Sequence, residues 1–186
     1  SLLESANVIF NKVFNNKNDV YSYPQVVLKE WSHEGGWEKP TFISFKENRL
    51  QITKFGGFTM IKDVYKVTPA CFAYFLKQVL HSGGDTKILI ITEIRPLEFS
   101  ISNLYKNFLA DMEGFNKIYF YGNEDVFDFL AKNLNNVFWL EKGNFYGEVL
   151  KIKSELNKNS VLGIKTSAFY KEIRRDLLLL EKENFK

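Results

Sequence analysis

Cysteine, histidine and long apolar runs are scarce in this chain of 186 residues, which has one cysteine and two histidines. The single Cys71 cannot form an internal disulfide bond, which excludes a disulfide-stapled scaffold and predicts a reducing compartment, the cytoplasm. No apolar run reaches the roughly 18 residues that a membrane-spanning helix needs, so we expect no membrane span. The first residues show no basic stretch followed by an apolar one, so we expect no signal peptide.

An excess of one charge is also missing, since 25 basic and 22 acidic residues give a net charge of only +3. That excess is too small to indicate a nucleic-acid partner by itself. Hydrophobic residues make up 45% of the chain and aromatic residues 16%, which is enough for a core and excludes intrinsic disorder. The length fits one domain, and we expect residues 1–186 to form it.

Residues 1–67 have the pattern of a helix followed by antiparallel strands. Apolar residues at helical spacing predict a helix over residues 6–14. Short apolar runs separated by turns predict an antiparallel meander over residues 26–67. The character changes at Thr68 and Pro69, a helix cap and a residue tolerated at a first helical position.

Residues 68–186 alternate between short apolar runs and helical stripes. This alternation predicts an α/β (or α+β) fold with a mostly parallel central sheet and flanking helices. We expect strands over residues 88–91, 118–122, 137–140 and 161–164. We expect helices to begin after four capping residues, Thr68, Ser100, Asn123 and Ser167. The segment Glu148–Ile152 fits either a strand or a helix.

Motifs of common catalytic chemistry are missing. The sequence contains no HExxH, GxGxxG, GxxxxGK[ST] or GxSxG pattern, and its cysteine and histidines lack the spacing of zinc ligands. We interpret Cys71 as a buried filler and His81 as a cation at a helix C-terminus. We therefore assign no catalytic residue and no metal site, expect no cofactor, and favour a binding protein over an enzyme.

Two groups of residues are candidates for binding. Trp31, His33 and Trp37 lie in one Gly-containing segment, which forms either an interaction surface with two aromatic anchors or a turn folded onto the sheet; we favour the turn. In open α/β sheets, ligands bind outside the carboxyl ends of the strands. Those ends supply four candidate ligand-binding residues, Glu93, Arg95, Tyr121 and Asn123.

Basic residues gather on the last expected helix. Lys171, Arg174 and Arg175 lie opposite its apolar face, where basic side chains can follow phosphates. The same helix carries four acidic residues, so we favour a solvated, salt-bridged face over a nucleic-acid site.

Residues 87–180 resemble the DICT sensory domain. The resemblance is carried by Ile88–Ile91 with Phe99 and Tyr105, and by the runs 118–124, 139–152 and 161–166. A looser likeness to STAS-type regulatory domains follows the same strand–helix order. Both imply a non-catalytic sensory or regulatory role, and neither supplies ligand residues for this chain.

These observations leave three hypotheses for function. The leading one is a regulatory or sensory binding module of a bacterial-type signalling system, with a protein partner or a small-molecule ligand. The second is an enzyme acting on a phosphorylated or carboxylated small molecule, with Glu93 as the acid–base group and Arg95 as the anion clamp. The third is a nucleic-acid-associated accessory protein that uses Lys171, Arg174 and Arg175.

Overall fold

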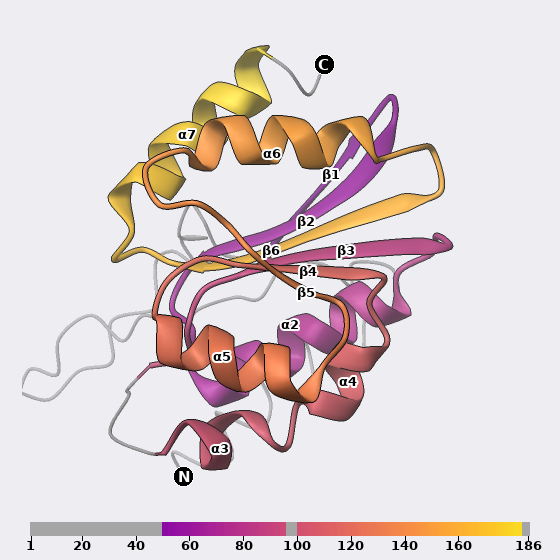
Figure 1. Cartoon of the computed structure of the whole chain (residues 1–186). Coiled ribbons are helices and arrows are strands. Elements are labelled where there is room, and N and C mark those ends of the chain that lie inside the picture. Colours follow the sequence, from indigo (N-terminus) through magenta and orange to yellow (C-terminus); the bar gives the residue numbers. More distant parts are fainter. Residues whose placement is uncertain (1–49, 96–99, 184–186) are drawn as a thin grey trace, which may run out of the picture. The chain divides into compact units, whose positions relative to one another are not determined.

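The computed structural model describes residues 50–95 and 100–183, which belong to one unit of the chain, Asn48–Lys186 (Figure 1). The strands are β1 (Gln51–Phe55), β2 (Phe58–Tyr65), β3 (Thr86–Ile91), β4 (Lys117–Phe120), β5 (Val137–Trp139) and β6 (Ser160–Ser167). The helices are α2 (Pro69–His81), α3 (Ile101–Tyr105), α4 (Leu109–Glu113), α5 (Glu124–Asn133), α6 (Phe145–Ser154) and α7 (Lys171–Glu183).

The six strands form one sheet in the order β1-β2-β6-β3-β4-β5. Strand β1 pairs antiparallel with β2, and the other four pairings are parallel. The prediction of an α/β fold with a mostly parallel sheet and flanking helices is therefore confirmed. Strand β2 is antiparallel to β1 on one side and parallel to β6 on the other, so the hairpin is continuous with the parallel sheet.

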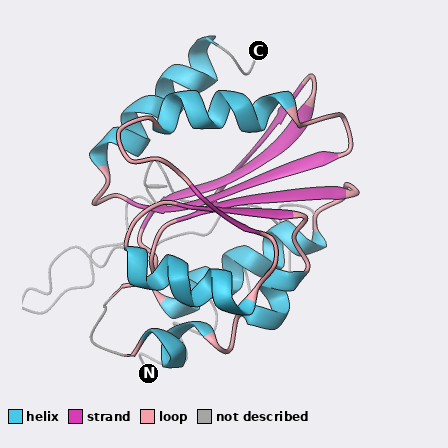
Figure 2. Ribbon diagram, in the orientation of Figure 1, coloured by secondary structure: helices cyan, strands magenta, loops and turns pink. Residues whose placement is uncertain are grey.

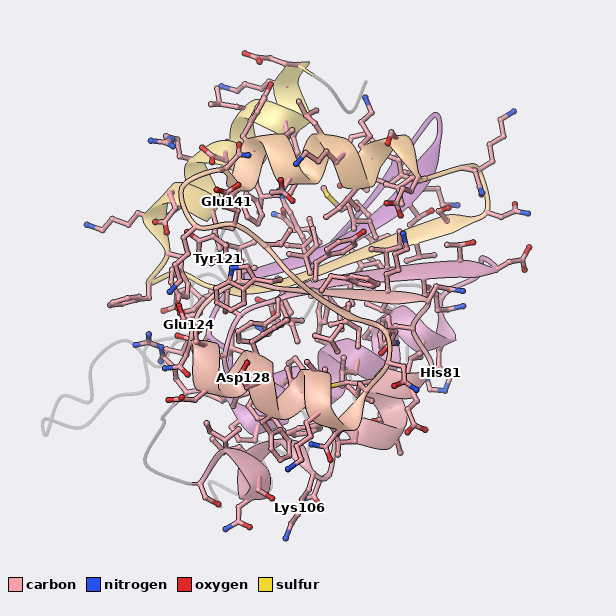
Figure 3. All side chains as sticks on the ribbon, viewed as in Figure 1. His81, Lys106, Tyr121, Glu124, Asp128 and Glu141 are labelled. Atoms are coloured by element: carbon pink, nitrogen blue, oxygen red, sulfur yellow. The ribbon has the colours of Figure 1, made fainter. Side chains whose placement is uncertain are left out.

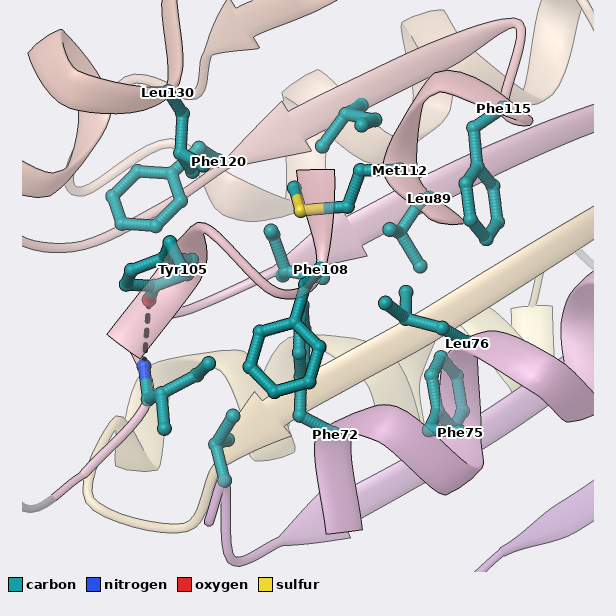
Figure 4. Close-up of a cluster of buried hydrophobic side chains, with 14 of the residues drawn as sticks. Phe72, Phe75, Leu76, Leu89, Tyr105, Phe108, Met112, Phe115, Phe120 and Leu130 are labelled. Atoms are coloured by element: carbon teal, nitrogen blue, oxygen red, sulfur yellow. Dashed lines mark hydrogen bonds between the residues drawn. The ribbon is translucent and has the colours of Figure 1, made fainter. Parts of the chain in front are cut away.

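Helices cover both faces of this sheet. Helices α2 to α5 lie on one face and α6 and α7 on the other, as Figure 2 shows in the same view. Each layer has its own buried cluster of apolar side chains. Figure 4 shows part of the α2–α5 cluster, where Phe72 packs edge-on against Phe108 and the Tyr105 hydroxyl accepts a hydrogen bond of 2.7 Å from the backbone N–H of Ile94.

Local signals explain where three helices begin. Thr68 caps α2 by accepting from the backbone N–H of Cys71, and Pro69 occupies the first turn. Ser100 and Asn123 cap α3 and α5 in the same way. These three starts were predicted from the sequence, and the helices there are confirmed.

Two helical regions differ from what the sequence predicted, and the structure assigns one segment that the sequence left ambiguous. The single helix expected after Ser100 is instead two short helices, α3 and α4. The ambiguous segment Glu148–Ile152 lies inside helix α6. The last helix begins at Lys171 and not directly after Ser167, so Phe169 precedes it and is exposed.

The helix expected over residues 6–14 and the strands expected before residue 50 lie outside the described residues. A single domain spanning residues 1–186 therefore stays a prediction. In the described part of the chain, no helix combines the length and apolar character needed to cross a membrane.

Candidate functional site

The carboxyl ends of β3, β4 and β6 meet at one edge of the sheet. The register places Ile91 beside both Phe120 and Lys165. The pairing continues beyond the strands, since the backbone N–H of Tyr121 donates to the carbonyl of Ile91 at 2.9 Å. The backbone N–H of Ser167 donates to the Thr92 hydroxyl at 2.9 Å. The residues after each strand are therefore held in fixed positions rather than in free loops.

Glu93 is the centre of this edge. Its carboxylate is almost fully buried, with 1% of the residue exposed. The Tyr170 hydroxyl lies 2.8 Å from both carboxylate oxygens. Arg95 donates to Glu93 Oε1 from Nη2 at 2.8 Å and from Nε at 3.3 Å. A buried carboxylate needs such donors, because an unpaired charge away from water is costly.

Gly122 forms a wall of this carboxylate site. It has a φ of +148°, a conformation that residues with side chains rarely adopt. A Cβ atom at this position would lie 2.1 Å from Glu93 Oε2 and 3.0 Å from the Tyr170 hydroxyl. Glycine at position 122 therefore lets the backbone that follows β4 approach the Glu93 carboxylate.

The Arg95 side chain extends from the buried Glu93 carboxylate to the protein surface. Its backbone N–H donates to the Val67 carbonyl at 2.7 Å, and its side chain is 41% exposed. The guanidinium lies over the Phe169 ring, with 4.3 Å from its central carbon to the ring centroid. The hydrogen bond to Glu93 raises the pKa of Arg95, so the side chain stays cationic at any ordinary pH.

Two tyrosines link this site to α7. The Tyr121 and Tyr170 rings meet edge to face with centroids 5.2 Å apart, and the Tyr121 hydroxyl donates to Glu172 at 2.9 Å. Burial is the main cause that raises the pKa of both hydroxyls, and hydrogen bonding to Glu93 further raises that of Tyr170. Both tyrosines are therefore neutral hydrogen-bond donors. Tyr121 lies between the two helical layers (Figure 3).

The predicted site residues separate into three groups. Glu93 and Arg95 are in direct contact, and Tyr121 joins them through Tyr170. Asn123 caps α5, because its side-chain amide oxygen accepts a hydrogen bond of 3.1 Å from the backbone N–H of Val126. That oxygen is therefore engaged in the helix cap. The second candidate surface, Trp31, His33 and Trp37, lies outside the described residues.

Sequence reasoning missed Tyr170. Tyr170 is 77 positions from Glu93, so no local spacing connects them. One available signal was the pair of aromatic residues, Phe169 and Tyr170, two and three positions after the end of the buried strand β6, at the edge where ligands bind.

A buried ion pair lies at the same edge of the sheet. Lys165 is fully buried and lies 2.9 Å from Asp63 Oδ2, its register partner on β2. Its amino group also donates to the Lys66 carbonyl. Within the described part of the chain, Asp63 Oδ1 has no hydrogen-bond partner.

Chemically, the arrangement suits an anion better than a metal ion. Among the described residues, no group of three or more His, Cys, Asp or Glu side chains is placed to hold a metal. A guanidinium fixed by a buried carboxylate and an aromatic ring is suited to a carboxylate or a phosphate, because its planar fork matches their oxygens.

Comparisons with known proteins find similarity only at the level of structure. No family model matches the sequence, and no curated protein sequence matches it. The MurF ligase from Thermotoga maritima in complex with ADP has a TM-score of 0.57 and 16% identity over 73% of this chain and 31% of that one. A MurF from Acinetobacter baumannii has a TM-score of 0.59 and 11% identity over 75% of this chain and 32% of that one. At such identities the similarity shows the fold alone, and the chain spans about a third of the length of these ligases.

This finding corrects the leading hypothesis from the sequence. The solved structures named above share the fold and are ligases, not signalling domains, and the prediction of a regulatory or sensory signalling module is wrong. That hypothesis rested on missing motifs and on hydrophobic patterns that many α/β sheets share. The resemblance to the DICT domain itself stays a prediction.

Proposed function

We propose that this chain is a domain of a ligase-like enzyme and that it binds an anionic group of a substrate, a phosphate or a carboxylate, through Arg95. The observation that carries the proposal is the fixed and partly exposed guanidinium of Arg95 at the carboxyl edge of the sheet. The fold similarity to ligases, one of them solved with ADP, supports the choice of an enzyme and of a phosphate.

Preorganisation is the physical basis of this role. A flexible arginine loses side-chain entropy when it binds an anion, whereas Arg95 is already held by Glu93 and by the Phe169 ring. The contacts to Glu93 use two of its N–H donors. An arginine fork has five, so donors remain for an incoming anion.

Glu93 then has a different task from the one the sequence suggested. As an acid–base group it would need contact with the reacting atoms. Its carboxylate is instead buried, bonded to Tyr170 and Arg95, and closed off by the Gly122 backbone. In this proposal Glu93 is a positioning residue that orients Arg95, and Tyr170 in turn orients Glu93.

Titration of three anions tests the proposal directly. ADP, inorganic phosphate and succinate are added in turn to the isotope-labelled chain, and the Arg95 Nε–H signal is followed by NMR. We expect at least one anion to shift this signal. Because a hydrogen bond to a charged group is worth about 1.5–3 kcal/mol, Arg95→Ala is expected to weaken binding about 10-fold to 100-fold.

Two further variants sharpen the result. Arg95→Lys keeps the charge without the planar fork, and we expect an intermediate affinity. Lys106→Gln removes an exposed cation from the helical layer away from this edge (Figure 3), and we expect the affinity to stay unchanged. Binding that Arg95→Ala leaves intact, or no binding of any of the three anions, would overturn the proposal.

A further inference from the structure

The acidic residues of α7 all have partners, and only Asp176 pairs with a cation of the same helix, Arg175, which leaves Lys171, Arg174 and Lys182 without an acidic partner on this helix. Glu172 accepts from the Tyr121 hydroxyl, and Glu181 pairs with Lys62 of β2. Glu183 lies 3.4 Å from the Tyr146 hydroxyl of α6. Asp176 is buried and pairs with Arg175, its neighbour on the same helix. The sequence suggested a solvated face with balanced charge, whereas three of the four acids bond to groups on other elements.

The side of α7 opposite its buried residues combines cations with exposed leucines. We call it the α7 outer face and define it by six exposed residues, Lys171, Arg174, Arg175, Leu178, Leu179 and Lys182. Their spacing of three, four, seven and eight positions places them on one side of a helix. Leu178 and Leu179 are 46% and 40% exposed, with cations one turn before them and one turn after.

We propose that the α7 outer face binds an anionic lipid surface. The charge is complementary to anionic headgroups, and both leucines sit between the cations, where they can enter the boundary between headgroups and acyl chains. The long lysine and arginine side chains can reach back to the headgroups while the leucines insert. The outer side of a single helix is convex, and a lipid surface can accept a convex face without a matching groove.

Nucleic acid fits this face less well. Binding to phosphates would use the cations but leave two exposed leucines at a polar interface. The face carries no aromatic side chain on which a base could stack. The proposal is also independent of Arg95, which lies at the edge of the sheet and not on the α7 outer face.

Vesicle sedimentation with the full chain tests the proposal. The probes are vesicles of phosphatidylcholine alone and vesicles with a large share of phosphatidylglycerol. We expect binding to the anionic vesicles, little binding to the neutral ones, and a steep loss of binding as salt is added. Each cation near an anionic surface changes binding roughly fivefold, so Arg174→Gln with Lys182→Gln is expected to weaken it roughly 25-fold.

Two control variants make the result specific. Lys106→Gln with Lys132→Gln removes the same charge from exposed positions on other elements, and we expect a much smaller effect. Leu178→Ser with Leu179→Ser keeps every charge, and we expect binding to fall roughly tenfold because apolar contact is lost. Circular dichroism and thermal unfolding establish that each variant is folded.

Several outcomes would overturn the proposal. These are no binding to anionic vesicles, equal binding to neutral vesicles, or equal losses for the α7 variant and its charge-matched control. Binding of an RNA oligomer or an acidic peptide without vesicle binding would assign the face to another partner. An unchanged affinity in the leucine variant would leave only general electrostatic attraction and would also contradict the proposal.

Discussion

At the scale of single residues, the buried charge of Glu93 constrains the residues around it. Glu93 has Arg95 as its cationic partner and Tyr170 as a neutral donor. Removing one partner from a buried charge costs more than the pair contributes, because the remaining charge is left unpaired away from water. The residues around Glu93 are therefore constrained by its carboxylate, and Gly122 is the most tightly constrained of them.

Replacing Gly122 with alanine tests that constraint. The new Cβ would lie 2.1 Å from Glu93 Oε2, so the buried carboxylate has to move. Alanine would also be strained at a φ of +148°. Together these effects are expected to lower the free energy of unfolding by about 2–4 kcal/mol, measured by urea denaturation.

Gly143→Ala is the matched control for the backbone conformation. Gly143 has a φ of +86° but has no atom near the position of an added Cβ. Its substitution is expected to cost only about 1 kcal/mol, from the backbone alone. If the two variants lose equal stability, contact with Glu93 is not the constraint at Gly122.

At the scale of elements, the sequence predicts a helix more accurately where a capping residue precedes apolar residues at helical spacing than where one of these signals is missing. Helices α2 and α5 have both signals and lie where the sequence placed them. Helix α6 was ambiguous because Gly147 weakens its first turn and because Val149 and Ile152 also favour strands. Its buried positions Phe145, Val149 and Ile152 do follow a helical spacing, but only in a window that starts at Phe145.

The sequence predicted only some of the residues of the candidate site. The rule that ligands bind at the carboxyl ends of strands located Glu93 and Arg95. The residues that hold them, Tyr170 and Gly122, depend on which strands become neighbours. That order places β6 beside β3 although the two are far apart in sequence, and single-sequence periodicity carries no information about it.

Substitution of Asn123 can distinguish its role as a helix cap from a role in ligand binding. The sequence suggested both a helix cap and a ligand contact for this residue, and the structure shows it as the N-cap of α5. Asn123→Ala is expected to lower the free energy of unfolding by about 1 kcal/mol, and Asn123→Ser to change it by less than about 0.5 kcal/mol, because serine also caps. Both variants are expected to keep the anion affinity of the original chain, measured in the NMR titration. A loss of affinity in the well-folded serine variant would restore Asn123 as a ligand residue.

At the scale of the whole molecule, the β1–β2 hairpin is joined to the parallel sheet by backbone pairing and by one buried ion pair. Asp63 on β2 and Lys165 on β6 are register partners as well as ion-pair partners. Around them, the two apolar clusters pack on opposite faces of the sheet. The sheet therefore carries a charged contact in its interior, where a wrong register would leave both charges unpaired.

Breaking this pair is expected to destabilise the entire unit. Lys165→Met leaves Asp63 buried without a cation, and the expected loss in the free energy of unfolding is about 3–5 kcal/mol. The double variant Lys165→Met with Asp63→Leu removes both charges and is expected to be more stable than the single variant. Urea denaturation of both chains measures the difference.

An exposed ion pair supplies the comparison for this last prediction. Lys117 and Glu155 lie 2.6 Å apart, but both side chains are more than one third exposed. Lys117→Met is therefore expected to cost less than about 1 kcal/mol, since water and salt screen the charge that remains. If Lys165→Met costs no more than Lys117→Met, water reaches Asp63. The link between the hairpin and the parallel sheet would then rest on backbone pairing and apolar packing alone.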